Sequence, residues 1–363
     1  MSNLDKNIMS SVRFKINPCI EFGCAIGAIG NYEVMIKLAE ELNFTLDKYD
    51  EEIFNKLYSN LSTYVKNEFK YFFSMSNINA LIFAFAVDNE AKEIDTVLKL
   101  LGEADEVTLF NYIGGVFIGE QLKGDTTAWC EVKDDMSKML SFIENINVED
   151  KEKKSKVIEC FKNPEETKQR LHFIFKQFYE KSYKSIEKEV LKQLELQEEK
   201  YKLSFNNNPQ EFMKKYFIDF FKPEKNNWPY KISIHVSLFQ QIGFSILNLH
   251  DYKEKEGLAA FGIRNFEYYF VKEKKEQVDK FLKALSDVRR VNIIKMLAQK
   301  PCYGYEIAAN LNISPATINY HMTFLTGVDI VTFERDENKV YYSLKKERVK
   351  ELMKESEKFL LNE

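Results

Sequence analysis

Apolar residues recur every three or four positions along most of the N-terminal part of the chain, which is the spacing of one face of a helix. The clearest stretches are 32–42, 53–73, 78–87, 94–101 and 165–201. Strand patterns are scarce among them. The spacing therefore predicts a body of packed helices, in which 165–201 forms one long helix.

The pattern changes after a proline-containing break at 223–229. Residues 232–237 alternate strictly between apolar and polar side chains, as a half-buried strand does. Two further strands are expected at 242–249 and 257–263. Together these segments predict a small antiparallel sheet within a strand-rich segment at about 231–271.

The last quarter of the chain returns to helical spacing. An apolar stripe covers 282–297, a proline ends that helix, and 305–311 predicts a second, shorter one. Asn312 follows at a position where asparagine tolerates the left-handed conformation of a helix end. Ser314 and Pro315 then start a third helix, because a serine oxygen caps orphan N–H groups and a proline at the first helical position loses nothing.

The third helix has an apolar and a polar face. Ile318, Met322 and Leu325 fall on the side that packs inward. The other side carries small polar residues and one aromatic: Ala316, Thr317, Asn319, Tyr320 and Thr323. Two helices joined by a tight turn, of which the second presents short polar side chains, have the geometry that places a helix in the major groove of DNA.

Two β-rich runs follow, 330–333 and 340–344, with a charged segment between them, and they predict a hairpin. Asp329 stands at the turn into it, where aspartate can adopt positive φ. We expect this hairpin to lie along the DNA backbone as a two-stranded wing, with Arg335 and Lys339 as phosphate contacts.

This C-terminal stretch resembles the winged helix of the ArsR-type bacterial transcriptional regulators. The matching segments are LSDVRR at 285–290, YEIAANLNIS at 305–314, ATINYHMTFL at 316–325 and VYYSL at 340–344. The resemblance implies a homodimer that binds an operator on double-stranded DNA through two recognition helices. The layout of the whole chain is similar to that of family members with an extended N-terminal domain, which implies a small-molecule effector or a partner acting on that domain.

The expected fold class is mainly α with a small antiparallel β component: a helical N-terminal domain and a C-terminal winged helix-turn-helix. The length of 363 residues fits two domains, which we place at 1–271, a sensor or regulatory domain, and 272–363, a DNA-binding domain that ends in a helix. The net charge of −4 divides into about −7 for residues 1–271 and about +3 for residues 272–363. This asymmetry favours a DNA-facing C-terminal end.

The sequence predicts no metal, no cofactor and no catalysis. The positions that match the metal-binding cysteine pair of the family hold Tyr303 and Tyr305, and tyrosine does not replace thiolate for a soft metal. No nucleophile motif, HExxH helix or phosphate loop is present. The glycine-rich run 21–30 lacks the strand that a nucleotide-binding loop needs before it, so it predicts a closely packed helix.

The five cysteines are odd in number and scattered, which indicates reduced thiols in the cytoplasm. The chain has no apolar run long enough for a membrane span and no signal-peptide pattern at its first residues. Of Arg289 and Arg290, one is expected at a phosphate, and Arg289 could instead hold Asp287 or a carbonyl group.

We therefore expect a cytoplasmic, dimeric, sequence-specific DNA-binding repressor. Its candidate DNA contacts are Ser314, Ala316, Thr317, Asn319, Tyr320, Thr323, Arg335 and Lys339. Three other classes stay open at this point. The winged helix could serve as a protein-interaction module, which an acidic wing tip favours; RNA binding is disfavoured by the lack of a stacking platform; and an enzyme could carry a regulatory winged helix.

Overall fold

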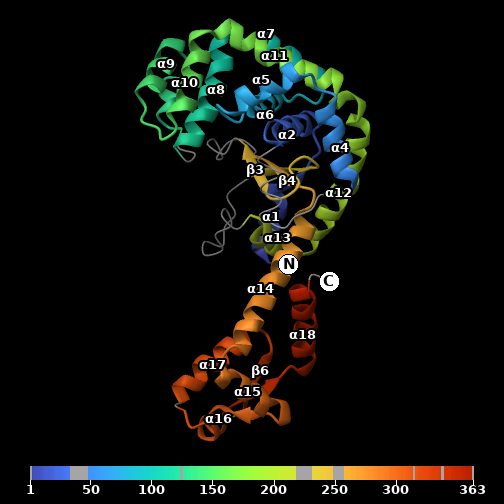
Figure 1. The fold of residues 1–363 in the computed structure, drawn as a ribbon, viewed down its shortest axis with the longest axis vertical. Helices are drawn as coiled ribbons and strands as arrows, with labels where there is room; N and C mark the ends of the chain where they lie inside the picture. Colours follow the sequence, from blue (N-terminus) through green and yellow to red (C-terminus); the bar gives the residue numbers. More distant parts are fainter. Residues whose placement is uncertain are drawn as a thin grey trace. The chain divides into compact units, whose positions relative to one another are not determined.

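The computed structural model describes residues 2–32, 48–122, 126–217, 231–247, 257–313, 315–336 and 339–361. The chain divides into two compact units, unit 1 (Met1–Asn265) and unit 2 (Phe266–Glu363). Helices dominate both (Figure 1), which confirms the expected mainly α fold class. The expected boundary between 271 and 272 lies inside one continuous helix, α14 (Asn265–Leu285). No described helix has both the length and the apolar character needed to cross a lipid bilayer.

Unit 1 is built mainly from helices that start at polar caps. In chain order it contains α1 (Asn3–Ser11), β1 (Val12–Phe14), α2 (Pro18–Gly30), α4 (Lys48–Ser59), α5 (Thr63–Phe73), α6 (Ala80–Asp88), α7 (Ile94–Glu103), α8 (Glu106–Gln121), η1 (Trp129–Glu131), α9 (Met136–Asn145), α10 (Lys151–Lys162), α11 (Pro164–Lys181), η2 (Tyr183–Ser185), α12 (Glu187–Asn207), α13 (Pro209–Tyr216), β2 (Ile232–Ser237), β3 (Phe244–Leu247) and β4 (Gly257–Gly262). Side-chain oxygens of Asn17, Asp105 and Asp150 accept backbone N–H groups at the starts of α2, α8 and α10. The glycine-rich run thus forms a buried helix, as predicted.

The single long helix expected at 165–201 is wrong, because the chain breaks at Ser182 between α11 and α12 (Figure 1). The Ser182 hydroxyl donates to the carbonyl of Leu57, 2.9 Å away, and one turn of η2 follows. Tyr183 is fully buried at this break and packs edge-on against Phe22. Neither glycine nor proline marks the site, and apolar spacing continues through it, so helical periodicity could not reveal the break.

The strands of unit 1 form a mixed sheet in the order β1-β2-β4-β3. The predicted strand 232–237 is confirmed as β2, but the sheet is not antiparallel, since β1 and β4 both pair with β2 in parallel and only β3 runs opposite to β4. Alternation of apolar and polar residues fixes which face of a strand is buried and says nothing of strand direction. The last part of the strand-rich segment is also corrected, because helix α14 begins at Asn265.

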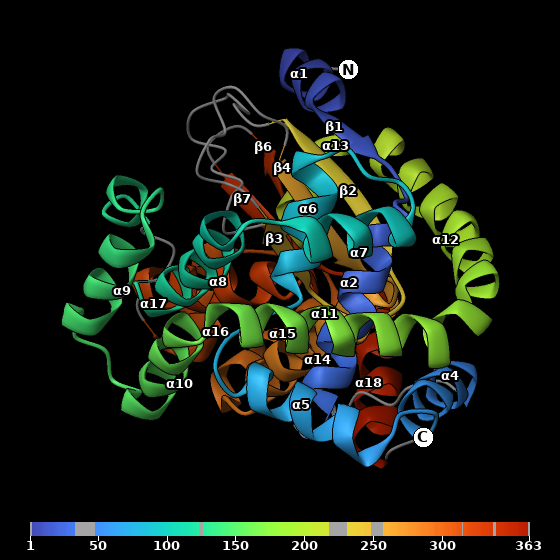
Figure 2. The ribbon, with the colours of Figure 1, turned by 90° about the horizontal axis from the view of Figure 1, so that it is seen from above.

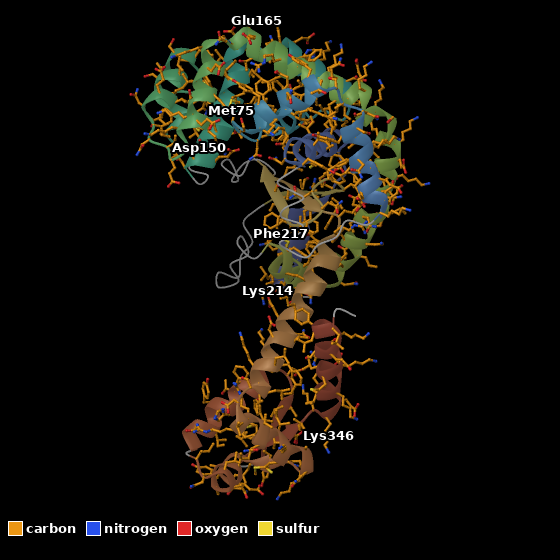
Figure 3. All side chains as sticks on the ribbon, viewed as in Figure 1. Met75, Asp150, Glu165, Lys214, Phe217 and Lys346 are labelled. Atoms are coloured by element: carbon orange, nitrogen blue, oxygen red, sulfur yellow. The ribbon has the colours of Figure 1, made fainter. Side chains whose placement is uncertain are left out.

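Aromatic side chains fill the core of unit 1. Phe22 on α2 lies within 5.7 Å of the ring of Phe178 on α11, in a stacked arrangement. A second cluster covers the sheet, where Phe217, labelled in Figure 3, stacks on Phe261 of β4 with ring centroids 5.7 Å apart. Aromatic pairs of this kind add to the free energy of burial. The aromatic richness of the sequence is thus largely used for packing.

A buried polar pair joins α2 to β2, elements that lie side by side (Figure 2). His235 on β2 and Glu21 on α2 are both fully buried, and Nε2 of the histidine is 2.9 Å from Oε2 of the glutamate. The backbone N–H of Asn17 donates to Nδ1 of His235, so the ring proton lies on Nε2 and is donated to Glu21. The other carboxylate oxygen accepts the N–H of Leu238. Every hydrogen-bonding group of this pair has a partner.

Unit 2 contains α14, α15 (Val288–Gln299), β5 (Cys302–Tyr303), α16 (Gly304–Leu311), α17 (Pro315–Gly327), β6 (Val331–Asp336), β7 (Lys339–Leu344) and α18 (Lys346–Leu361). Its strands pair antiparallel in the order β5-β7-β6. The wing is therefore a three-stranded sheet and not the two-stranded hairpin expected, because the two residues of β5 pair with Tyr342 and Tyr341. Strands β6 and β7 also extend farther into the charged segment than their apolar residues indicated.

Candidate nucleic-acid interface

Helix α15 begins at a charged cap. Oδ1 of Asp287 accepts the backbone N–H groups of Arg289 and Arg290, at 2.8 and 3.4 Å. Partial burial opposes ionisation of this carboxyl, but the two N–H groups and the nearby cations outweigh burial and hold the pKa of Asp287 below its ordinary value. The carboxylate is therefore charged at neutral pH and occupied as a helix cap.

The two arginines that follow the cap have different roles. Arg290 is buried, donates to the carbonyl of Lys283 at 2.6 Å, and holds its guanidinium 4.1 Å from the ring centroid of Phe324. It thereby ties α15 to the end of α14 and to α17. Arg289 is exposed. The carbonyl contact, which the sequence left open for Arg289, is made by Arg290, and helical spacing alone did not distinguish which arginine turns inward.

The turn between α16 and α17 has the predicted conformation. Asn312 is left-handed, with φ 53° and ψ 47°. The backbone N–H of Ile313 donates to the carbonyl of Ala308, and the N–H of Asn312 to that of Ala309, which is the Schellman pattern of a helix end. The tight turn of a helix-turn-helix follows directly from this arrangement.

Helix α17 has the two faces that its sequence predicts. Ile318, Met322 and Leu325 are buried in the core of unit 2. On the other side, Tyr320 is 64% exposed and Thr323 is exposed, whereas Thr317 is half-buried. Of the remaining candidates on this segment, Ser314 lies outside the described residues, as do the side chains of Ala316 and Asn319.

The wing starts and ends where the sequence places it. Asp329 adopts φ 61° at the turn before β6, as expected, and its carboxylate lies 2.6 Å from Nζ of Lys345. Arg335 pairs with Val340 and Asp336 with Lys339, which puts both basic candidates at the tip of the hairpin, where the chain passes from β6 to β7. The side chains of Arg335 and Lys339 lie outside the described parts of the structure.

Tyr303 and Tyr305, which the resemblance matched to a metal-binding cysteine pair, have ring centroids 6.2 Å apart. Tyr303 also lies 6.0 Å from the ring of Tyr341, and Tyr305 is 67% exposed. In the described ranges, no group of three or more His, Cys, Asp or Glu side chains is placed to hold a metal ion.

His321 on α17 is the residue whose environment the sequence did not reveal. Its exposed fraction is 3%, and neither ring nitrogen has a hydrogen-bond partner among the described residues. Nδ1 lies 3.9 Å from Oδ2 of Asp287. Helical spacing signals its burial, because His321 lies three residues after Ile318 and four before Leu325, both of which are buried.

Comparison with known proteins agrees with this geometry. Residues 287–332 match the family model described as bacterial regulatory protein, arsR family. The matched range runs from the cap of α15 into β6 and so includes the whole helix-turn-helix. Unit 2 therefore carries an ArsR-family helix-turn-helix domain, which supports a DNA-binding transcription regulator. No curated protein matches the chain.

Proposed function

We propose that the protein is a transcription regulator that binds double-stranded DNA sequence-specifically by inserting α17 into the major groove. The observation that carries this proposal is the division of α17 into two faces. Ile318, Met322 and Leu325 anchor the helix in the core, which leaves Tyr320 and Thr323 directed at solvent on a rigid support. A recognition helix needs this combination, because side chains can read base edges only from a fixed position.

The proposed contacts divide by their position in unit 2. Thr317, Asn319, Tyr320 and Thr323 approach base edges or phosphates from α17, with Ala316 close to the DNA and Ser314 capping the helix beside a phosphate. Arg335 and Lys339 contact the backbone from the wing, and Arg289, exposed at the start of α15, is a further phosphate contact.

The test is a titration of the full-length protein against a random duplex pool at two salt concentrations. We expect selection of a duplex and a marked loss of affinity at the higher salt, because phosphate contacts release counterions. Tyr320→Ala should weaken binding to the selected duplex by about 1–3 kcal/mol. Asn319→Ala should have a similar effect.

The matched control is Tyr305→Ala, since Tyr305 is as exposed as Tyr320 but lies on α16. It should leave affinity for the selected duplex nearly unchanged. Equal losses from the two tyrosine variants, or a lack of salt-sensitive binding to any duplex, would contradict insertion of α17.

We also propose that the protein acts as a homodimer through α18, whose first residue, Lys346, is labelled in Figure 3. Leu352 fixes this helix to the core of unit 2, yet its other positions expose large apolar side chains: Met353, Phe359, Leu360 and Leu361. Exposed apolar side chains gathered on one helix favour a protein contact. Sedimentation should give a dimer that Leu360→Glu dissociates and Lys358→Glu does not; a monomeric parent protein would rule the dimer out.

The proposed role of unit 1 is to make operator binding respond to an effector, so that the regulator acts as a repressor in the cytoplasm. Unit 1 has a shallow, open surface hollow of about 740 Å³ along α9, lined by the apolar Val132, Phe142 and Ile146 and by polar residues that include Ser137 and Lys138. Thermal unfolding of the full chain against a small-molecule set tests this role. A ligand that raises the midpoint in the parent protein and not in Phe142→Ala would locate the site, and a ligand equally effective in both would place it elsewhere.

One observation favours a second function for unit 2, as a protein-interaction module. Tyr303, Tyr305 and Tyr341 form an aromatic group on its surface, and Asp336 stands at the wing tip. In that case Tyr305→Ala, and not Tyr320→Ala, would impair activity in cells, and no duplex would be selected.

A further inference from the structure

The imidazole of His321 is enclosed without a hydrogen bond. It is 3% exposed on the inner side of α17, and in the described part of unit 2 nothing donates to or accepts from either ring nitrogen. The nearby charged side chain is that of Asp287. Its Oδ2 lies 3.9 Å from Nδ1 of His321, and this distance is too long for a hydrogen bond. A neutral imidazole tolerates this site better than a charged one, because a buried charge without a partner costs far more than a buried dipole.

The cation beside His321 is immobilised. Arg290 is held by the carbonyl of Lys283 at 2.6 Å and by the ring of Phe324 at 4.1 Å. Its guanidinium therefore cannot move away if the histidine becomes positively charged. Protonation would place two cations in one desolvated region of unit 2.

Among the described residues, the charged groups that act on His321 come from the start of α15. They are Asp287, Arg289 and Arg290, so one carboxylate stands against two guanidinium groups. Burial lowers the pKa of His321 below its ordinary value of 6.5, Asp287 opposes that shift, and the two arginines add to it. Oδ1 of Asp287 caps α15 through two backbone N–H groups, and Oδ2, the oxygen that faces His321, is also 3.9 Å from Nε of Arg290.

We propose that His321 is a positioning residue for the recognition helix, and that its protonation moves α17 and weakens operator binding. A protonated ring must gain a partner, and the facing carboxylate is Asp287. Closing the distance of 3.9 Å to a hydrogen bond requires that α17 moves toward the start of α15 or that the Asp287 carboxylate shifts toward α17. Movement of α17 displaces the neighbouring Tyr320, the exposed aromatic of the recognition face. The proposal rests on the proposed DNA-binding function.

The experiment compares the full-length parent protein with His321→Gln, which stays neutral at every pH, and with His172→Gln as the matched control in unit 1. Fluorescence anisotropy measures the affinity for the selected duplex between pH 7.5 and 5.5. For the parent we expect a loss of about tenfold, because the DNA-bound form takes up the proton less readily than the free form. The same loss is expected in His172→Gln, and less than about twofold in His321→Gln. If His321→Gln does not fold, His321→Asn takes its place.

The direction of the effect separates this proposal from ordinary electrostatics, since added positive charge usually tightens binding to DNA. Affinity that rises on acidification, or a loss that persists in His321→Gln, would overturn it. If no duplex binds at any pH, the DNA-binding proposal fails. The proposed movement of α17 on protonation of His321 is then tested by nuclear magnetic resonance and amide exchange. Carbon-13 histidine resonances should then show His321 titrating below 6.5 together with faster amide exchange in α17, and exchange that does not change with its titration would end the proposal.

Discussion

The two units each bury a histidine, and the surroundings of the two rings differ. His235 in unit 1 has a partner at both nitrogens, the N–H of Asn17 and the carboxylate of Glu21. His321 in unit 2 is nearly as buried and has a partner at neither among the described residues. A satisfied buried pair rigidifies a core, whereas an unsatisfied group is held in place only by the packing around it. Unit 1 thus uses its histidine as a fixed connection, and unit 2 retains one at a cost in stability.

The largest effect should come from His235→Phe. The substitution leaves the Glu21 carboxylate buried without its side-chain donor and the N–H of Asn17 unpaired, so the free energy of unfolding should fall by about 3 kcal/mol. Urea denaturation of the full chain followed by circular dichroism measures it. An unchanged midpoint would show that the pair contributes nothing to stability.

Arg290→Met should have the next largest effect, a loss of about 2 kcal/mol, because it removes the bond to the Lys283 carbonyl and the contact with Phe324. The neighbouring exposed Arg289→Met is its control and should change stability by less than about 0.5 kcal/mol. For DNA affinity we expect the reverse ranking of the two variants, because Arg289→Met removes a proposed phosphate contact. Similar stability losses in both variants would contradict the assigned roles.

His321→Phe should be neutral or should stabilise unit 2 by about 1 kcal/mol, since it replaces an unsatisfied ring by an apolar one of similar shape. The gain should grow as pH falls. The folded-state pKa of His321 lies below 6.5, so the unfolded chain binds the proton more readily and acid destabilises the parent protein from about pH 6.5 downward. Denaturation curves of parent and variant at pH 7.5 and 5.5 measure the difference. A variant less stable than the parent at both pH values would mean that the imidazole has a partner.

The smallest change in stability should come from substitutions that relieve backbone strain at residues with positive φ. Asn312→Gly should stabilise unit 2 by less than about 1 kcal/mol, because glycine adopts the left-handed conformation without strain. Asp329→Gly relieves the same strain but loses the ion pair with Lys345, and should gain less. Thermal unfolding of the three proteins ranks them, and a marked loss in Asn312→Gly would point to a role for the asparagine side chain.

Turn residues and helical spacing predicted most of the secondary structure of unit 2. Asn312 and Asp329 were expected to allow positive φ and do so, and the inward positions of α17 follow directly from helical spacing. The same kind of signal placed β2 and the buried helix α2 in unit 1. The spacing of apolar residues could not predict which distant segments contact each other. The parallel pairing of β1 with β2 joins segments far apart in the sequence, and the break at Ser182 depends on the carbonyl of Leu57 on another helix.

The sequence by itself determined the helix-turn-helix, because caps, turn residues and apolar spacing act over a few neighbouring positions. It also determined which side of α17 faces solvent. The tertiary structure alone decided that Arg290 and not Arg289 turns inward, that β5 joins the wing, and that His235 is satisfied while His321 is not. The reason is that hydrogen bonds and desolvation depend on atoms that distant segments bring together. The residues next to a position in the sequence do not specify those atoms.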